Sequence, residues 1–485
     1  MHPLLSTGLW LKIAILVNIL PTKLLPILLL GTLLSAEGPP PVAKLLADLI
    51  RLNTSNPPGN EDLVAQFLAP LFKAAGFEVD IINTPQKGKS HFVARLRGNG
   101  SKKPILLAAH ADVVGVELEK WSVDPFAGVI RDGYVIGRGA IDFKGGLAVF
   151  AQAVLDIAAS KKTLDRDIIF LSEADEEGGT YNAGWLAERH WDKIDCEFSL
   201  NEGGWIVKDD NSSAVKYVSI STADKSSINI RIRAKGTSTH SSMPLADNAI
   251  FRLSRALAKV GAYDTKPKLN ASTKMFFKTL ADTSPEPLKT HFYNLVDGTD
   301  PAKVAAADKA ISQNVLLHSI MRNTIAPVFL NAGFRGNVIP GSADATLNFR
   351  IIPGTSAGEL IDELKSVIDD PLVEVTELAV DASRKRPPIP ESPITSALYT
   401  ALARHARQTY PEALVTPNLF QAGTDAYAWR SRGIPVFGIY PYPITAEDLT
   451  RMHGNDERVP VDSLVTGLKM ITNLLLDVAA SKDHP

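Results

Sequence analysis

Cysteine is almost absent from this sequence. Cys196 is the single cysteine among 485 residues. One cysteine cannot form a disulfide within the chain, and it excludes a cluster of thiolate metal ligands. Any bound metal must therefore be held by histidine, aspartate and glutamate, a ligand set that suits zinc, manganese or cobalt better than softer ions.

An excess of charge of either sign is also missing. The chain has 51 basic and 53 acidic residues, which leaves a net charge of −2. This balance gives no reason to expect nucleic acid as a partner. Apolar residues make up 45% of the chain, as in an ordinary globular protein, and 485 residues are too many for one core. We therefore expect two or more domains.

Long hydrophobic runs are confined to the N-terminus. Residues 9–36 are almost all apolar, interrupted by two lysines and two prolines. The run ends in Ala36-Glu37-Gly38, a small-x-small pattern typical of a cleavage site. We therefore expect residues 1–38 to be a signal peptide and the protein to be periplasmic or secreted. The alternative is a retained anchor over residues 9–36, and only then would a membrane be a partner.

Short apolar runs alternate with helical patterns along the rest of the chain. Runs such as 104–110 and 167–173 are typical of strands buried on both faces, and their alternation with helices predicts an α/β layer sandwich. The runs at 226–236 and 343–352 instead alternate polar and apolar residues, as in strands with one exposed face. These runs predict a smaller α+β domain inserted into the first domain.

The expected boundaries follow from this change of pattern. The first domain has two parts, at 39–222 and 387–485, and the inserted domain lies between them at 223–386. Within the inserted domain, residues 263–330 predict a mostly helical insertion that is rich in lysine, aspartate and alanine.

Charged side chains gather where several predicted strands end. The strand-end groups are His110, Asp112, Glu176, Glu177 and Glu202, and Asp142 directly precedes a predicted helix. In open α/β sheets, functional groups collect outside the carboxyl ends of the strands. Each residue alone has an ordinary explanation as a loop residue, a cap or a solvated charge. Because carboxylates repel one another and resist burial, their joint placement favours a bound cation.

The spacing of His110 and Asp112 adds to this interpretation. One intervening residue places both side chains on the same side of an extended segment. Asp112 can then accept the free ring N–H of His110 and fix its tautomer, as partners of metal-ligating histidines commonly do.

Eight segments, in family order from about residue 42 to 480, resemble the M20 family of metallopeptidases. This family includes carboxypeptidases, aminoacylases, dipeptidases and succinyl-diaminopimelate desuccinylase. The segments are HADVV (110–114), GRGAIDFKGG (137–146), SEADEEGG (172–179), NEGG (201–204), GTSTHSSMP (236–244), NVIPGSADATLNFR (337–350), AGTDA (422–426) and MHGNDERV (452–459). The long inserted domain is most similar to the carboxypeptidase S and N-acyl-amino-acid hydrolase branch. Gly115 departs from the pattern, because many members have proline there.

The resemblance implies a zinc-peptidase type of catalytic domain, with a mixed sheet in three layers and an inserted lid or dimerisation domain. It implies two divalent ions, zinc first and manganese or cobalt as alternatives. Asp142 would bridge both ions, with His110 and Glu202 on one and Glu177 and His453 on the other. Asp112 would orient His110, and Glu176 would be the general base.

The resemblance also implies a substrate and a partner. His240, from the inserted domain of a neighbouring subunit or of a closed lid, would stabilise the oxyanion, which makes a homodimer expected. Arg350, Asn337, Gly423 and Thr424 are the candidates for binding a free carboxylate. The expected substrate is a peptide or an N-acyl amino acid.

A protein without catalysis is the alternative from another class. Two domains and an export signal also suit a solute-binding or scaffold protein on the same fold. Such a protein has no use for the acidic ligand set, and this sequence keeps Glu176 and every ligand.

Overall fold

The computed structural model describes residues 38–210, 212–378 and 389–481. The expected signal peptide therefore falls, except for Gly38, outside the described residues. Among the described helices, none has the length and apolar character needed to cross a membrane.

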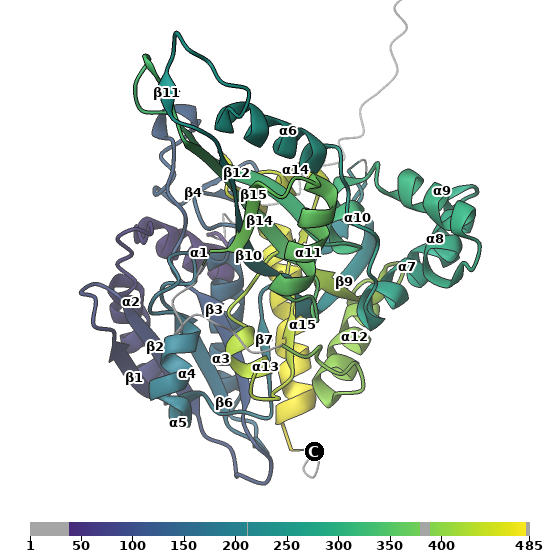
Figure 1. The fold of residues 1–485 in the computed structure, drawn as a ribbon. Coiled ribbons are helices and arrows are strands. Elements are labelled where there is room, and N and C mark those ends of the chain that lie inside the picture. Colours follow the sequence, from purple (N-terminus) through teal and green to yellow (C-terminus); the bar gives the residue numbers. More distant parts are fainter. Residues whose placement is uncertain (1–37, 211, 379–388, 482–485) are drawn as a thin grey trace, which may run out of the picture. The chain divides into compact units, whose positions relative to one another are not determined.

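A ten-stranded mixed sheet forms the larger part of the fold (Figure 1). Its order is β1-β2-β6-β3-β7-β17-β9-β8-β18, and β16 pairs with β9. The strands are β1 (Glu78–Asn83), β2 (Ser90–Leu96), β3 (Ile105–His110), β6 (Ile168–Glu173), β7 (Phe198–Asn201), β8 (Ile206–Lys208), β9 (Val215–Asp224), β16 (Leu414–Phe420), β17 (Val436–Gly438) and β18 (Pro443–Ile444). The central strands β6, β3, β7 and β17 are parallel, whereas β1 and β2 are antiparallel to their neighbours. β9 is antiparallel to both β17 and β8, and β18 is parallel to β8.

Helices cover both faces of this sheet, because alternate residues of its buried strands point to opposite sides. Leu107 and Ala109 of β3 belong to one core, and Leu106 and Ala108 belong to the other. The first core is completed by α1 (Pro41–Arg51), α2 (Asp62–Ala74), α3 (Lys144–Ser160), α12 (Ala397–Thr409) and α15 (Val461–Ala479). The second is completed by α4 (Ala183–Arg189), α5 (Trp191–Ile194) and α13 (Tyr427–Arg430). The prediction of a mixed-sheet, three-layer α/β fold is confirmed.

A second, antiparallel sheet has the order β12-β14-β10-β15. Its strands are β12 (Thr324–Ala332), β14 (Ser342–Ile351), β10 (Ser226–Lys235) and β15 (Val373–Glu377). Alternate residues of β10 and β14 are buried against α6 (Ala249–Gly261) and α11 (Ala357–Ile368), which form a separate core with this sheet. The two half-exposed patterns in the sequence thus correspond to neighbouring strands of one sheet. Small additional elements are β4 (Val129–Arg131), β5 (Tyr134–Ile136), β11 (Thr239–His240), β13 (Val338–Ile339), α14 (Ala446–Leu449) and β19 (Arg458–Pro460).

Residues 263–330 are mostly helical but end in a strand. Four helices, α7 (Ala271–Thr283), α8 (Leu288–Asp297), α9 (Pro301–Ile311) and α10 (Val315–Ile320), share their own apolar core. The last residues of this range form the start of β12, at the edge of the antiparallel sheet. The sequence-based expectation missed this strand because Pro327 interrupts its pattern, and a proline is tolerated at an edge.

The helical insertion contacts the segments that join the two sheets. Ser272, in the first turn of α7, lies within hydrogen-bond distance of Thr222 on β9 and of Glu391 on the returning segment. Lys225, which lies between β9 and β10, is buried and donates to the backbone oxygens of Ser319 and Arg322 at 2.8 Å each. These bonds tie the insertion to both connections between the sheets.

Candidate active site

Five predicted ligands converge beyond the carboxyl ends of the parallel strands. His110 ends β3, Glu202 follows β7, Glu177 follows β6, and Asp142 precedes α3. His453 comes from the loop between α14 and β19. All five lie within one cluster of short ring-to-carboxylate distances. His453 is more than three hundred residues from both His110 and Asp142 in the sequence, and its loop brings it to the other four side chains.

Asp142 stands at the centre of the cluster. Its Oδ1 lies 3.3 Å from His110 Nε2, and its Oδ2 lies 2.9 Å from His453 Nε2. His110 Nε2 is also 3.6 Å from Glu202 Oε2, and His453 Nε2 is 3.2 Å from Glu177 Oε1. The two oxygens of one carboxylate therefore face two separate histidine–glutamate pairs.

Glu176 lies beside this cluster. His110, Glu176 and Glu202 each offer one potential ligand atom, and these three atoms lie within 4.8 Å of one another. The same holds for His110, Asp142 and Glu177. Burial and the neighbouring charge of Glu202 hold the pKa of Glu176 well above its usual range. Burial likewise raises the pKa of Glu202 to about 7.

The neighbouring carboxylates perturb both histidines of the cluster. Hydrogen bonds to Asp142 and Glu177 raise the pKa of His453 to about 10. Burial alone would lower the pKa of His110, but Glu202 and the other neighbouring carboxylates raise it well above its usual range. Both shifts show that the cluster attracts positive charge.

The donor set fits divalent ions. Imidazole nitrogens and carboxylate oxygens are the ligands of zinc, manganese and cobalt, and no thiolate is present. Glu177 Oε1 is buried and lies 3.2 Å from His453 Nε2. Several carboxylates buried this close together are costly unless positive charge neutralises them. The cluster can therefore hold two cations that share Asp142.

Asp112 supports the cluster in a way that the sequence only partly indicated. Nδ1 of His110 is closer to the backbone oxygen of Asp112, at 2.9 Å, than to its carboxylate, at 3.6 Å. The carboxylate accepts the backbone N–H groups of Glu176 and Glu177, at 3.1 and 3.0 Å. Asn56 donates to it as well, at 2.8 Å. Asp112 therefore fixes the loop that carries Glu176 and Glu177 as well as the ring of His110.

The chain matches the family described as Peptidase family M20/M25/M40 over residues 106–477. It belongs to this family. A probable carboxypeptidase S-like protein of Dictyostelium discoideum is 32% identical over 367 residues, which cover 74% of this chain and 69% of that protein. The N-fatty-acyl-amino acid synthase/hydrolase PM20D1 of Homo sapiens is 29% identical, over 80% of this chain and 76% of that protein. The sequence-based prediction of an M20 hydrolase is confirmed.

Solved structures share the fold. The M20 metallo-carboxypeptidase Sso-CP2 of Sulfolobus solfataricus aligns with a TM-score of 0.64 at 18% identity, over 90% of this chain and 98% of that one. A dinuclear metal-binding M20 peptidase of Bacillus subtilis aligns with a TM-score of 0.56 at 14% identity, over 90% and 97%.

Two supporting residues of this M20 site carry no role in the sequence-based prediction. Glu457 is buried, pairs with Arg138, and accepts the backbone N–H groups of Gly139, Ile141 and Asp142. It therefore positions the segment that presents Asp142. Glu457 lies within the segment MHGNDERV, which could have pointed to it. Tyr440, which donates to two of the ligands, lies in an apolar stretch that gave no such signal.

The residues predicted to stabilise the oxyanion and to bind the substrate lie in three places. His240 on β11 pairs with Val338 on β13, and Ser241 N donates to Asn337 O at 3.1 Å, so His240 and Asn337 are neighbours. Arg350 is an exposed residue of β14. Thr424 is buried, and its hydroxyl donates to Asp224 at 2.6 Å; Gly423 precedes it on the same loop. Within the described ranges, no hydrogen bond or ion pair connects His240, Asn337 or Arg350 to the ligand cluster.

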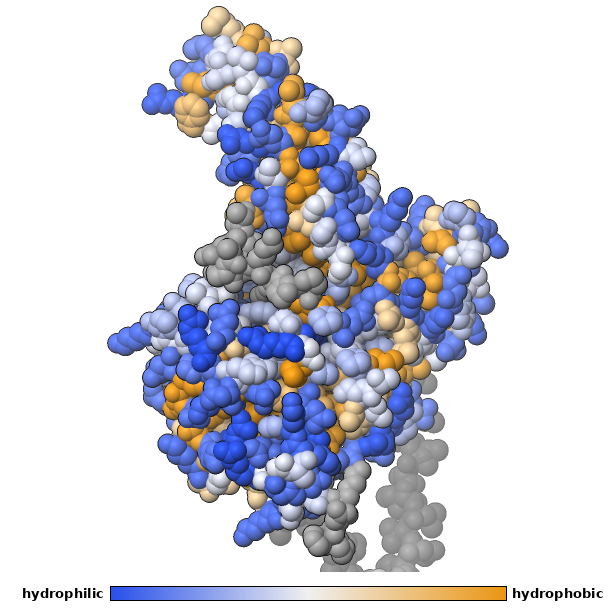
Figure 2. Space-filling view, turned by 60° about the horizontal axis from the view of Figure 1, so that its bottom comes forward, coloured by the Kyte–Doolittle hydropathy of each residue, from blue (hydrophilic) through white to orange (hydrophobic). Residues whose placement is uncertain are grey.

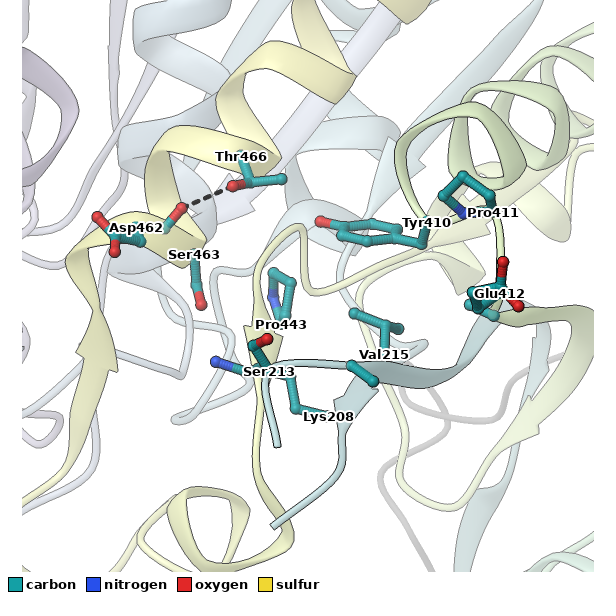
Figure 3. Close-up of a pocket in the computed structure, with 12 residues that line it drawn as sticks. Lys208, Ser213, Val215, Tyr410, Pro411, Glu412, Pro443, Asp462, Ser463 and Thr466 are labelled. Carbon is teal, nitrogen blue, oxygen red and sulfur yellow. Dashed lines mark hydrogen bonds between the residues drawn. The ribbon is translucent and has the colours of Figure 1, made fainter. Parts of the chain in front are cut away.

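A separate pocket lies elsewhere on the larger domain (Figure 3). It has a volume of about 300 Å³ and is lined by residues of β8, β9, the α12–β16 connection and the first turns of α15. The hydroxyl of Tyr410 points into it from one wall, and this buried oxygen has no hydrogen-bond partner within the described parts of the chain. None of the ligand cluster lines this pocket.

Proposed function

We propose that this protein hydrolyses the amide bond of peptides or N-acyl amino acids with a free carboxylate, using two divalent ions, most simply zinc. The single observation that carries the proposal is the position of Asp142, whose two oxygens face His110 and His453 at 3.3 and 2.9 Å. His110 and Glu202 would hold one ion, and Glu177 and His453 the other. The names of the relatives, a carboxypeptidase S-like protein and an N-fatty-acyl-amino acid hydrolase, support this substrate class.

Glu176 is the proposed general base. Two divalent ions, when bound, would supply the positive charge that lowers the pKa of the attacking water and polarises the substrate carbonyl. Glu176 takes the proton of that water and passes it to the leaving amine. The backbone N–H of Glu176 donates to Asp112 at 3.1 Å, and a carboxylate oxygen of Glu176 lies within 4.8 Å of ligand atoms of His110 and Glu202. His240 would stabilise the oxyanion, and Arg350, Asn337 and the N–H groups of Gly423 and Thr424 would bind the substrate carboxylate.

Metal analysis and one substitution test the proposal. We expect about two zinc, manganese or cobalt ions for each purified chain. A screen of dipeptides and N-acyl amino acids should then find turnover in the metal-loaded protein and none in Glu176→Gln, which should keep its metal. A protein that binds no metal, or a Glu176→Gln variant with undiminished turnover, contradicts the proposal. Metal-free protein that binds an amino-acid ligand without turnover would favour a solute-binding function instead.

We also propose a homodimer through the inserted domain. Large apolar side chains are exposed along β12 and on α6, with Phe329 68% and Phe251 66% exposed. Figure 2 shows apolar side chains in the upper part of its view. The large apolar side chains that the inserted domain exposes include Met243, Phe251, Phe329, Leu330 and Phe334. Strand β12 also has a free edge, which can pair with another strand.

Molar-mass measurement by light scattering tests the dimer. Phe329→Glu should convert a dimer of the parent protein to a monomer, whereas Val315→Glu, at an 81% exposed position on α10, should not. A parent protein that is already monomeric contradicts the proposal.

We also propose that the protein is exported and that its N-terminal segment is cleaved. The apolar run of residues 9–36 and the pattern at 36–38 support a cleaved signal peptide. N-terminal sequencing of the protein recovered from its own compartment should begin near Gly38, and an intact Met1 would contradict cleavage.

A further inference from the structure

An open groove borders the ligand cluster and has no role in the function proposed so far. Its volume is about 740 Å³, within the range of ligand-binding clefts. One wall is the connection between α1 and α2, at Asn53 and Ser55, and the other is the loop that follows β3. The lining residues of this loop are Gly115, Val116, Leu118, Trp121, Ser122, Val123, Asp124, Pro125 and Phe126.

Hydrogen bonds connect the first wall, the α1–α2 connection, to the half of the cluster that carries Glu177. Ser55 forms a β-bridge with Val113, and the next residue, Asn56, donates from its side chain to Asp112 at 2.8 Å. Asp112 in turn accepts the backbone N–H groups of Glu176 and Glu177. Two hydrogen bonds therefore separate this wall from the proposed base.

The second wall is bonded to the half that carries His453. Arg138 Nη2 donates to the backbone oxygens of Gly115 and His453, at 3.4 and 3.3 Å, and the guanidinium lies 5.3 Å from the ring centre of Trp121. Ser122 donates from both its backbone and its hydroxyl to Asp456. The groove thus lies against the loop of His453, whose side chain is 49% exposed and forms the open side of the cluster.

The groove offers apolar surface and few free polar groups. Val116, Leu118, Trp121, Val123, Pro125 and Phe126 supply its apolar side chains. The side chains of Asn53, Ser122 and Asp124 are already bonded to Ser55, Asp456 and Phe126. Leu118 leaves 64% of its surface exposed. Exposed apolar side chains gathered in a groove mark a binding surface, whereas single ones do not.

We propose that this groove binds the apolar acyl chain of an N-acyl amino acid while its amide bond lies at the cluster. The inference rests on the proposed function and names the part of the substrate that sets its specificity. The candidates for the carboxylate, Arg350 and Asn337, belong to β14 and to the residue before β13, and neither lines the groove. The substrate carboxylate would therefore be bound outside the groove, which leaves the groove available for the acyl chain.

Substrates with acyl chains of increasing length test the inference, in the parent protein and in a variant with one charged residue in the groove. The substrates are N-acetyl-, N-octanoyl- and N-dodecanoyl-phenylalanine, and the protein is the metal-loaded full chain. In the parent protein kcat/KM should rise at least about tenfold from acetyl to octanoyl, because each added methylene leaves water. Leu118→Glu should remove this rise and leave the acetyl substrate unchanged. Because Leu118 is exposed, this substitution should not destabilise the folded protein.

Leu71→Glu is the matched control, because Leu71 is a 42% exposed leucine on α2 that does not line the groove. It should keep the parent chain-length dependence. A parent protein indifferent to chain length, or a Leu118→Glu variant equally impaired on all three substrates, overturns the inference.

A binding measurement separates this inference from the proposed function. Calorimetry with dodecanoate uses the parent chain and Leu118→Glu, so its outcome does not depend on turnover. Binding to the parent that is weakened at least about tenfold by Leu118→Glu supports the groove even where no amide is hydrolysed. Absence of binding, or equal binding to both proteins, overturns it.

Discussion

Tyr440 donates its hydroxyl to the carboxylate of Asp142, with Oη 3.1 Å from Oδ1. The same oxygen lies 3.0 Å from Glu202 Oε2. The phenol ring is held from two sides, stacked on Trp205 with ring centres 4.1 Å apart and edge-on to Phe143 at 5.0 Å. A rigid aromatic ring therefore fixes the spacing of two carboxylates that would otherwise repel each other.

Tyr440→Phe should weaken metal binding while leaving the fold intact. The ring keeps its packing, but the carboxylates lose the hydrogen bond that orients them. Loss of such an outer partner typically lowers metal affinity by about 10- to 100-fold. Titration with a competing chelator measures this change, and circular dichroism verifies the fold. An unchanged affinity would show that Asp142 and Glu202 are positioned by the backbone alone.

The strand-end ligands could be predicted from sequence, whereas Tyr440 could not. His110, Glu177 and Glu202 follow apolar runs directly, so their place on the sheet edge follows from the topology of parallel strands. Tyr440 lies in the apolar stretch PVFGIYPY, of which only Val436–Gly438 forms a strand. A tyrosine in such a stretch is expected for packing alone, and the direction of its hydroxyl depends on contacts with distant residues.

Among the strands that were not predicted from sequence, β12 and β16 share one physical reason. β12 contains Pro327 and β16 contains Pro417, and a proline within a strand pattern argues against a strand. Both strands lie where this rule is relaxed, because β12 is at the edge of its sheet and β16 pairs only with β9. Each also has a shift of register close to its proline. The edge position of these strands depends on the whole fold and cannot be predicted from the local sequence pattern.

His240→Ala should lower kcat much more than metal content. His240 is exposed on β11, and among the described residues its side chain bonds only to Ser242, with Nδ1 2.7 Å from Oγ, so its loss should leave the ligand cluster intact. Removing one oxyanion donor typically lowers kcat by about 10²- to 10³-fold. Steady-state kinetics with metal analysis of the same sample measures both quantities. Ser242→Ala is the control, and equal effects of both substitutions would remove His240 from the reaction.

Tyr410→Phe should leave the protein at least as stable as the parent. The Tyr410 hydroxyl is buried without a hydrogen-bond partner within the described ranges, and burial raises the pKa of this phenol. Deleting it should increase the free energy of unfolding by up to about 1 kcal/mol. Tyr442→Phe is the matched control, because Tyr442 donates to the backbone oxygen of Ile141 and its loss should be destabilising. Urea denaturation compares the three proteins. A Tyr410→Phe variant as unstable as Tyr442→Phe would show that the Tyr410 hydroxyl does form a stabilising hydrogen bond.

His91→Gln should reduce the acid sensitivity of the fold. Burial lowers the pKa of His91 to about 4; Nδ1 accepts from Ala174 N at 3.2 Å, and Nε2 contacts Tyr181 O at 2.8 Å. The folded protein therefore keeps this ring neutral, whereas the unfolded chain binds a proton below pH 6.5. Stability contributed by the neutral ring is lost as the pH falls from about 6.5 toward 4. Glutamine can make both hydrogen bonds but does not titrate. The difference in unfolding free energy between parent and variant should thus shrink by about 2 kcal/mol from pH 7 to pH 5. Urea midpoints at these two pH values measure it, and a constant difference would mean that folding does not lower the pKa of His91.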